Sequence, residues 1–473
     1  MKETYPTINS NWLTSYTGDV FADTGGHVIK YLSEIHPEKD IMQLIEYITT
    51  IYVNKWDAKI NTFFLNSKIT QPAYNKKQKT DETLKYFSEL ITNKAQSTEG
   101  YCRISGEQTY LYKAGRDNSI MSGSGTFVNF HHSFQSGLML SREMIIRMFF
   151  VPFGVISVGG KIAIIQSNND YINHHFVKEI CKKNIRNIGS AKSGEVLKSE
   201  YGIPANALFS FINDLFFCDL PEIRSRITQE LSFTLYHFTN FGASPEISLY
   251  QLPATVFCFY TNCHTPELKN DWMKFERAHY KSSKYKEAKY DTDKSIYEFV
   301  RKNEKEIIPF DDYKLWRNVV LESLLNNKPL LPLFLKWGEN NIFNFKIVEI
   351  YQKHIRNMRK ETINKIKELA KFLVKGDEDT IQKHLKKLNG CKNSYEVRRF
   401  LLKEVAVRNY NDGAEEPVLT LEDMVYYLFP DDQPWKDIRD LLLFAVYQEL
   451  HALNKRIAAD LLQEDENDDT ENE

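Results

Sequence analysis

The chain has 473 residues, 42% of them hydrophobic, and a formal net charge of −2. This length allows roughly two to four domains, and the hydrophobic share excludes a largely disordered protein. The near-neutral total charge favours no class of partner. Acidic residues crowd positions 464–473, which we expect to form a disordered tail, and the rest of the chain is mildly basic.

The sequence carries no sign of secretion or of a membrane. Its six cysteines show no framework spacing, which predicts reduced thiols. The N-terminal sequence MKETYPTINSNW has no apolar core of a signal peptide. The longest apolar stretch, 145–158, is interrupted by Arg147, Pro152 and Gly154 and is too short to span a bilayer. We therefore expect a cytoplasmic protein.

The first part of the chain predicts mixed secondary structure. Asp40 suits the N-cap of an amphipathic helix that reaches Tyr52, because apolar residues recur there every three or four positions. Residues 66–80 are polar and basic and are predicted to form a loop. Farther on, Gly159 and Gly160 separate two β-prone runs, which predicts a hairpin with a two-residue turn.

The middle of the chain alternates basic and apolar segments. Residues 178–198 are basic, and Pro204 is expected to open an apolar helix. The stretch 248–260 is predicted to be a strand that breaks at Pro253.

Tyrosines recur every five residues between lysines at Tyr280, Tyr285 and Tyr290. Exposed rings in this basic setting would stack on unpaired bases. Tyrosines that pack against the core from one face of an element would give the same spacing, and we consider this the better explanation.

The region 341–463 is predicted to be entirely helical. An apolar stripe from Ile347 to Leu373 predicts a first helix that ends before Gly376, and its opposite face is basic. The predicted fold class is therefore α+β. It has a mixed N-terminal domain over 1–340, with a ribbon-like subdomain at about 100–165, and then a helical bundle over 341–463.

No catalytic motif is found. The sequence lacks GxxxxGK[ST], HExxH, GxSxG and GxGxxG. The pairs His131-His132 and His174-His175 are poor chelators, because neighbouring residues of a strand point to opposite faces. We expect no enzymatic activity, no metal and no cofactor.

The segment 101–160 has the layout of a zinc ribbon that has lost its ligands. Cys102 stands three residues before Ser105, and Ser141 stands three residues before Met144. A structural zinc site needs four ligands in two facing knuckles, which one thiolate cannot supply. We expect a metal-free ribbon, held instead by the packing of aromatic side chains. These are Tyr110, Tyr112, Phe127 and Phe130.

Four stretches together resemble the large subunit of the type I-B CRISPR effector complex, Cascade. They are YTGDVFADTGGHVIKYL at 16–32, FFLNSKITQP at 63–72, KAGRDNSIMSGSGTFVNFHH at 113–132 and IVEIYQKHIRNM at 347–358. Members of that family with an intact ribbon carry two cysteine pairs, so the ribbon of this chain is degenerate. The resemblance is thin between 165 and 245.

The resemblance implies a nucleic-acid-binding subunit without chemistry of its own. Base pairing with the guide CRISPR RNA would select the sequence. The large subunit would recognise the PAM, open the target duplex and recruit the helicase-nuclease. The C-terminal bundle resembles the small subunit and would bind the displaced single strand. The partners would be guide RNA, double-stranded target DNA, and the Cascade backbone and small subunits, with no membrane.

Residue type and position indicate four groups of nucleic-acid-binding residues. Lysine and arginine neutralise phosphates, and Asn129 can bind a base edge from a glycine-rich loop, although an ordinary turn before a strand is the better explanation of that loop. The candidates are Ser124, Thr126, Asn129 and His131 for duplex recognition; Lys76, Lys77 and Lys79 for the target backbone; Lys182, Lys183 and Arg186 for RNA or duplex phosphates; and Lys353, Arg356, Arg359 and Lys360 for the displaced strand.

Two other functions fit the sequence. One is a nuclease with an unfamiliar site, although the sequence has no cluster of carboxylates to support it. The other is a scaffold that binds only proteins, in which the basic tracts are solvated faces.

Overall fold

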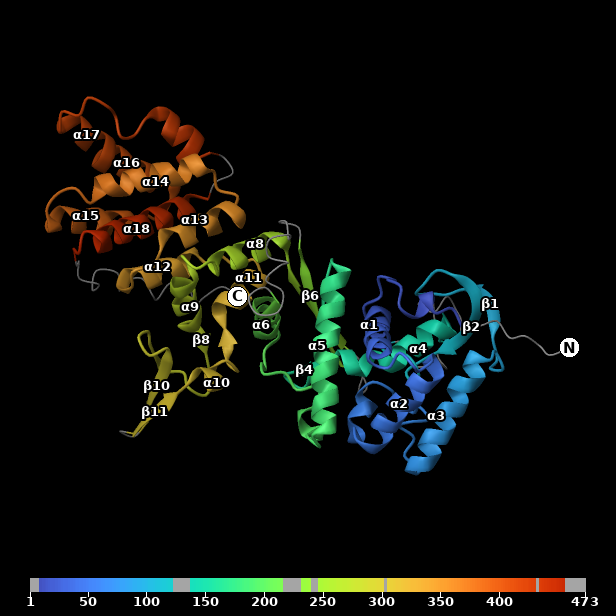
Figure 1. Ribbon diagram of the computed structural model, residues 1–473. Helices are drawn as coiled ribbons and strands as arrows, with labels where there is room; N and C mark the ends of the chain where they lie inside the picture. Colours follow the sequence, from blue (N-terminus) through green and yellow to red (C-terminus); the bar gives the residue numbers. More distant parts are fainter. Residues whose placement is uncertain are drawn as a thin grey trace. The chain divides into compact units, whose positions relative to one another are not determined.

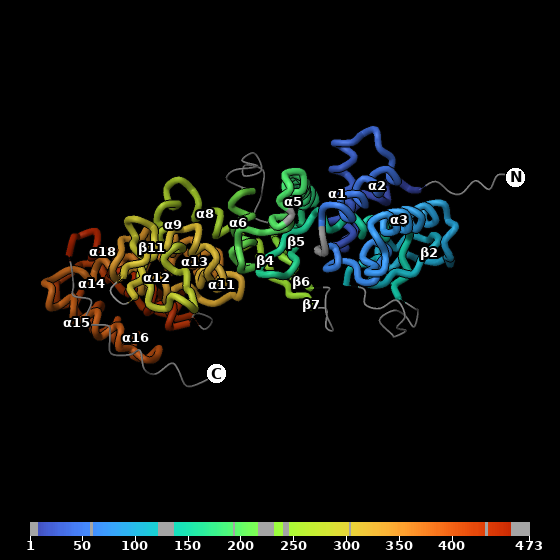
Figure 2. Tube along the Cα trace, turned by 90° about the horizontal axis from the view of Figure 1, so that it is seen from below, coloured from blue at the N-terminus to red at the C-terminus, as the bar shows by residue number. Residues whose placement is uncertain are grey.

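Helices dominate the regular structure, and the strands form small antiparallel sheets (Figures 1 and 2). The computed structural model describes residues 8–121, 137–215, 231–239, 246–301, 304–430 and 434–455. Internal contacts divide the chain into unit 1, Met1–Leu252, and unit 2, Pro253–Glu473. The predicted α+β class with a helical C-terminal region is confirmed. The predicted domain limits, at 340 and at the tail, stay predictions.

Unit 1 combines helices with two antiparallel sheets, ordered β1-β2-β3 and β4-β5-β6-β7. Its helices are α1 (Val20–Ile35), α2 (Ile41–Asn54), α3 (Lys76–Ile91), α4 (Arg142–Phe150), α5 (Asp170–Gly189) and α6 (Pro204–Asp214), with 3-10 helices at Asn11–Leu13, Asp57–Thr62, Val151–Gly154 and Ser193–Glu195. Its strands are β1 (Thr98–Tyr101), β2 (Gln108–Ala114), β3 (Leu138–Ser141), β4 (Ile156–Val158), β5 (Lys161–Ser167), β6 (Phe233–Thr239) and β7 (Glu246–Leu252).

Close packing of α1 against α4 organises the core of unit 1 (Figure 1). Asp19 caps α1 and accepts hydrogen bonds from the amides of Phe21 at 3.0 Å and Ala22 at 2.8 Å. A Cβ atom at Gly25 would lie 2.0 Å from the carbonyl oxygen of Arg147 in α4. The glycine therefore sets how near the two helices can come.

Several predicted elements of unit 1 are confirmed. The helix capped by Asp40 is α2, and Pro204 is the first residue of α6. The hairpin joins β4 to β5 through Gly159 and Gly160, which have φ values of +56° and +87°. Two successive positive φ angles are typical of the tight turns that match strand twist.

Unit 2 begins with helices and small sheets and ends in helices alone. Its sheets are ordered β11-β10-β9 and β12-β8. Its strands are β8 (Tyr280–Lys281), β9 (Lys289–Asp291), β10 (Ile296–Arg301), β11 (Glu304–Ile308) and β12 (Arg317–Asn318). Its helices are α8 (Ala254–Cys263), α9 (Lys269–Arg277), α10 (Phe310–Tyr313), α11 (Val319–Leu325), α12 (Leu331–Asn340), α13 (Phe345–His354), α14 (Lys360–Leu373), α15 (Glu378–Asn389), α16 (Ser394–Leu401), the π-helical η7 (Leu402–Val407), α17 (Arg408–Asn411), the π-helical η8 (Asp423–Leu428) and α18 (Trp435–Ala452).

The last helix, α18, packs against α12, α14, α15 and α16 (Figure 1). Its buried side chains include Leu441, Leu442 and Phe444, so it forms the centre of this helical region. Among the residues that the structure describes, no helix has the length and apolar character needed to cross a bilayer.

Three local predictions were wrong, each for an identifiable reason. The predicted loop 66–80 stops at Asn75, whose side chain starts α3. The predicted strand 248–260 ends at Leu252, because Pro253 has no amide proton for a sheet and leads into α8 instead. The single helix predicted from Ile347 to Leu373 is two helices, α13 and α14.

Candidate nucleic-acid interface

The first group of predicted lysines lies at the N-terminus of α3. The Asn75 side chain accepts a hydrogen bond from the amide of Gln78 at 2.9 Å, and Gln78 returns one to the amide of Asn75 at 3.0 Å. Lys76 and Lys77 are exposed and Lys79 is half-buried. None of the three forms an ion pair within the described parts of the chain. The positive end of the helix dipole adds to their charge, so this terminus attracts anions.

The second group lies on α5, and its three members differ. Lys182 is half-buried and contacts Glu179 at 2.5 Å. Lys183 and Arg186 are exposed and have no ion pair among the described residues. Lys183 and Arg186 are three positions apart, so they share one face of the helix. The free positive charge of this group therefore belongs to Lys183 and Arg186.

The third group, in unit 2, does not form one helix face. Lys353 and Lys360 are exposed, in α13 and at the start of α14. Arg356 is half-buried and contacts Asp437 of α18 at 3.3 Å. Arg359 donates to the carbonyl oxygen of Tyr426 at 3.4 Å. The two arginines therefore help to join the helices of this unit, and the lysines carry the free charge.

The residues predicted for duplex recognition lie outside the described residues. They are Ser124, Thr126, Asn129 and His131, and Phe127 and Phe130 of the expected ribbon packing lie there too. Their predicted roles stay predictions.

The positions of the degenerate ribbon come together at the start of α4. The amide of Ser141 donates to the Cys102 sulfur at 3.3 Å, and the Ser141 hydroxyl accepts from the amide of Met144 at 3.3 Å. Burial raises the pKa of the Cys102 thiol, but hydrogen bonds from the Ser105 side chain and from nearby amides outweigh this and lower it. In the described residues, no three His, Cys, Asp or Glu side chains gather as metal ligands.

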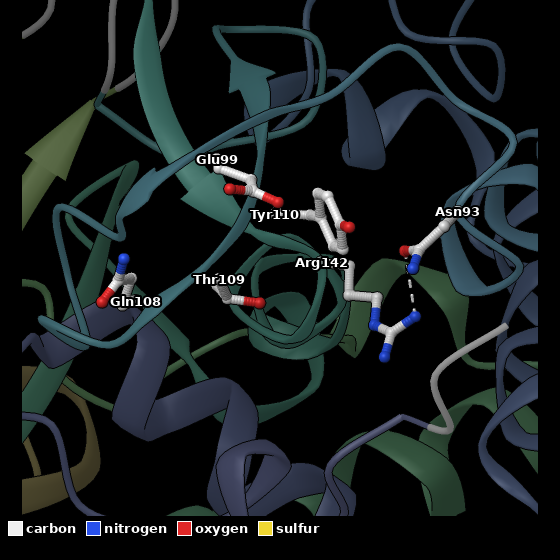
Figure 3. A pocket seen from close by; sticks show the side chains of 6 residues that line it. All are labelled: Asn93, Glu99, Gln108, Thr109, Tyr110 and Arg142. Atoms are coloured by element: carbon white, nitrogen blue, oxygen red, sulfur yellow. Dashed lines mark hydrogen bonds between the residues drawn. The ribbon is translucent and has the colours of Figure 1, made fainter.

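Aromatic packing at the ribbon is only partly as expected. Tyr112 is buried and donates to Asn93 Oδ1 at 2.5 Å, whereas Tyr110 is 42% exposed. Tyr110 lines a cavity of about 390 Å³ together with Asn93 and Arg142 (Figure 3). Arg142 donates to Asn93 Oδ1 at 3.1 Å and to the Ile91 carbonyl oxygen at 2.8 Å. These bonds engage the guanidinium, and the other charged residue of the lining is the acidic Glu99, so this cavity offers an anionic ligand little free positive charge.

The regularly spaced tyrosines of unit 2 belong to the core. Tyr280 is 5% exposed and packs with Tyr297 and Tyr313, and Tyr285 and Tyr290 pack against this cluster. Stacking on unpaired bases needs exposed rings. The packing explanation is therefore correct for this segment.

Exposed aromatic residues lie elsewhere in unit 2, on the continuous helical run from α16 through α17. Tyr395 is 69% exposed and Tyr410 is 83% exposed. Arg399 and Lys403 of the same run are exposed and make no ion pair with any described residue. Aromatic rings and free cations together suit a single strand, whose bases stack while its phosphates are neutralised.

The sequence analysis did not single out this face, although a signal was present. Val397, Leu401 and Val405 recur every four residues and are buried, and they mark the core side of the run. Tyr395 and Tyr410 lie off that stripe. Exposed rings that share a helical run with free cations are a candidate surface for a single strand.

Comparison with known families finds a match to the C-terminal part of the chain. Residues 336–472 match the model of a family described as the DevT C-terminal domain. No curated protein matches the chain. The match begins in α12 and includes the helices that pack on α18, together with the exposed aromatic run. This helical segment, less than a third of the chain, is therefore similar to the DevT C-terminal domain.

Proposed function

We propose that the protein is the large subunit of a CRISPR RNA-guided surveillance complex, a Cascade, and that it binds nucleic acid without cleaving it. The observation that carries this proposal is the match of residues 336–472 to the DevT C-terminal domain. A DevT-like domain suggests a component of such a complex. The four stretches that resemble a type I-B large subunit, three of them in unit 1, support the same role and favour that subtype.

Unit 1 would recognise the PAM, open the target duplex and contact the guide RNA. Free cations support this assignment, at Lys76, Lys77 and Lys79 on α3 and at Lys183 and Arg186 on α5. Cations without an internal partner can release counterions when they meet phosphates, whereas paired cations must first give up a carboxylate.

Unit 2 would bind the displaced single strand. Tyr395 and Tyr410 supply exposed rings, and Arg399 and Lys403 supply free charge on the same helical run. Lys353 and Lys360 add two exposed cations. The backbone and small subunits of Cascade and the helicase-nuclease would be the protein partners.

Reconstitution tests the proposal. The full chain is coexpressed with the neighbouring effector subunits and a guide RNA, and the purified particle is titrated with matched duplexes that differ only at the PAM positions. We expect the chain to copurify with guide RNA, and duplex affinity to depend on the PAM and to fall steeply with salt. A particle that forms without this chain, and binds duplexes equally well, contradicts the proposal.

A further inference from the structure

A second cavity in unit 1 lies beside α3, one helical turn after Lys79. Its volume is about 200 Å³, and its walls come from residues 64–69, from α3, from residues 117–118 and from the end of α4. Sites for drug-sized molecules are larger, at roughly 300–1,000 Å³. The cavity therefore suits one small ring system.

Aromatic rings line one side of the cavity. The Phe64 and Phe149 rings are stacked, with centroids 6.0 Å apart, and the Phe87 ring lies 4.7 Å from Phe149. All three side chains are at most 5% exposed. The rings are fixed by their neighbours, so a planar ligand would meet a preformed apolar wall.

A buried hydroxyl in the cavity wall has no partner. Thr83 is 3% exposed, and its Oγ1 makes no hydrogen bond to any described residue. Helical threonines of this chain normally donate to the carbonyl oxygen four residues earlier. Thr24, Thr49 and Thr80 do so, at 2.7, 2.7 and 3.1 Å. An unsatisfied buried hydroxyl costs stability, and a polar ligand in the cavity would satisfy this one.

The opposite wall is polar and is held in place. The Tyr86 hydroxyl accepts a hydrogen bond from Asn118 Nδ2 at 2.8 Å, which leaves its own proton without an acceptor among the described residues. The amide of Leu65 donates to the carbonyl oxygen of Arg116 at 2.8 Å and joins the two loops that form the rim. The site therefore exists before any ligand binds.

Positive charge near the cavity comes from Lys68 in its lining and from two lysines on the Thr83 face of α3, against one carboxylate in the lining. Lys68 is exposed and has no ion pair within the described residues. Lys76 and Lys79 precede Thr83 by seven and four positions, so they share its face of α3. The exposed carboxylate of Asp117 is the exception, and it can accept hydrogen bonds from exocyclic amines.

We propose that this cavity receives one unpaired nucleobase, whose flanking phosphates contact Lys68 and Lys79. This inference rests on the proposed function and extends it to a specific subsite. The aromatic wall stacks on the base, the Thr83 and Tyr86 hydroxyls bond its edge, and Asp117 accepts from an amino group. An apolar side chain of a partner protein would fill the same volume, but it would leave Thr83 unsatisfied and gain nothing from the lysines.

Binding of short oligonucleotides to the full chain tests the subsite. Fluorescence anisotropy compares single-stranded DNA and RNA 12-mers with fully abasic strands of equal length and charge. Stacking and edge bonds of one base predict roughly 5- to 140-fold weaker binding of the abasic strand to the wild type. The DNA and RNA arms identify which strand is preferred.

Three variants assign that difference to the cavity. Thr83→Phe fills the cavity and Thr83→Val removes only the hydroxyl. Thr80→Val on the same helix is the matched control, because the Thr80 hydroxyl is already bonded within the helix. We expect Thr83→Phe to lower the preference for base-containing strands to the part that the exposed rings of unit 2 supply, Thr83→Val to lose a smaller part of it, and Thr80→Val to match the wild type. Thermal melting confirms that each variant is folded.

Two results overturn the subsite. One is a base preference that both Thr83 variants retain in full. The other is unchanged oligonucleotide binding together with loss of one effector subunit from the particle, which would assign the cavity to a protein side chain. The subsite and the proposed function fail separately, because oligonucleotide binding is measured on the chain alone and PAM-dependent duplex binding on the particle.

Discussion

The Arg147 guanidinium and the Asp23 carboxylate form an ion pair of 2.8 Å, with side chains that are 1% and 3% exposed. Arg147 also donates to the carbonyl oxygens of Ala22 at 2.6 Å and Ser15 at 2.8 Å. Asp23 accepts from the amide of Thr17 at 2.9 Å. Every charge in this cluster has partners, so α4 is joined to α1 and to the turn before it.

Replacing Arg147 by Met should destabilise unit 1 by about 3–5 kcal/mol, because Asp23 and the carbonyl oxygens lose their donor while they stay buried. Urea unfolding of the full chain measures the change. Lys183→Met, at an exposed site, is the control and should change the free energy of unfolding by less than about 0.5 kcal/mol. Equal effects of the two variants would contradict this account.

Replacing Gly25 by Ala should also destabilise unit 1, since the new Cβ atom would overlap the Arg147 carbonyl oxygen. Forcing an atom into a packed core costs about 1–3 kcal/mol or more. Gly189→Ala at the end of α5 is the control, because no atom lies within 4 Å of its added Cβ. A melting temperature for Gly25→Ala at or above that of Gly189→Ala would show that α1 and α4 are not in close contact.

Burial sets the pH dependence of His27. Desolvation, followed by His174, lowers the pKa of His27 from 6.5 to about 4. Asp23 opposes this shift, while Arg147 and Lys30 add to it. Between these pH values the unfolded chain binds a proton that the folded chain does not.

The contribution of His27 to stability should therefore fall by about 3 kcal/mol as pH drops from 6.5 to 4, and it should level off below pH 4. Urea unfolding at several pH values measures the slope. His27→Gln should reduce the slope in this window, because it removes the group whose pKa burial lowers. If His27→Gln has the same slope of stability against pH as the wild type, the titrating group is a residue other than His27.

Much of the fold could be predicted from the sequence, because helix caps and tight turns depend on residues that are neighbours in the chain. The Asp40 cap and the Gly159-Gly160 turn are determined by a few adjacent side chains. The helix start at Lys76 was missed because a polar segment gives no apolar period, and only the Asn75–Gln78 pair marks it. The apolar period from 347 to 373 runs across two helices, so it gave no sign of the break between them.

The candidate site was harder to predict, because charge in the sequence does not indicate whether a cation is free. Lys182 and Lys183 are neighbours with the same side chain, yet among the residues that the structure describes only Lys182 has a carboxylate partner. Arg356 lies in a basic tract, and its partner Asp437 is far away in sequence. Pairing of this kind depends on tertiary structure, which local patterns do not contain.

Neutralising the α3 lysines should weaken duplex binding by the assembled complex. The triple change of Lys76, Lys77 and Lys79 to Gln removes up to three phosphate contacts, so the slope of log affinity against log salt should fall by up to about 2.7. Titration of a labelled duplex at several salt concentrations measures this. Lys182→Gln is the control, because its charge is already paired with Glu179. An unchanged slope in the triple variant would exclude α3 from the phosphate path.

Removing the Tyr410 ring should weaken single-strand binding by unit 2 without affecting duplex recognition. Tyr410→Ala should cost about 1–3 kcal/mol of single-strand affinity if one base stacks on this ring, while thermal stability should hardly change because the ring is 83% exposed. Protection of the displaced strand from a chemical probe of unpaired bases, measured in the complex, should be lost at one position. Tyr171→Ala on α5, also an exposed tyrosine, should leave the protection intact. If the displaced strand is protected equally in both variants, the helical run from α16 through α17 faces a protein or solvent and not the strand. The free charges of Arg399 and Lys403 would then need another partner.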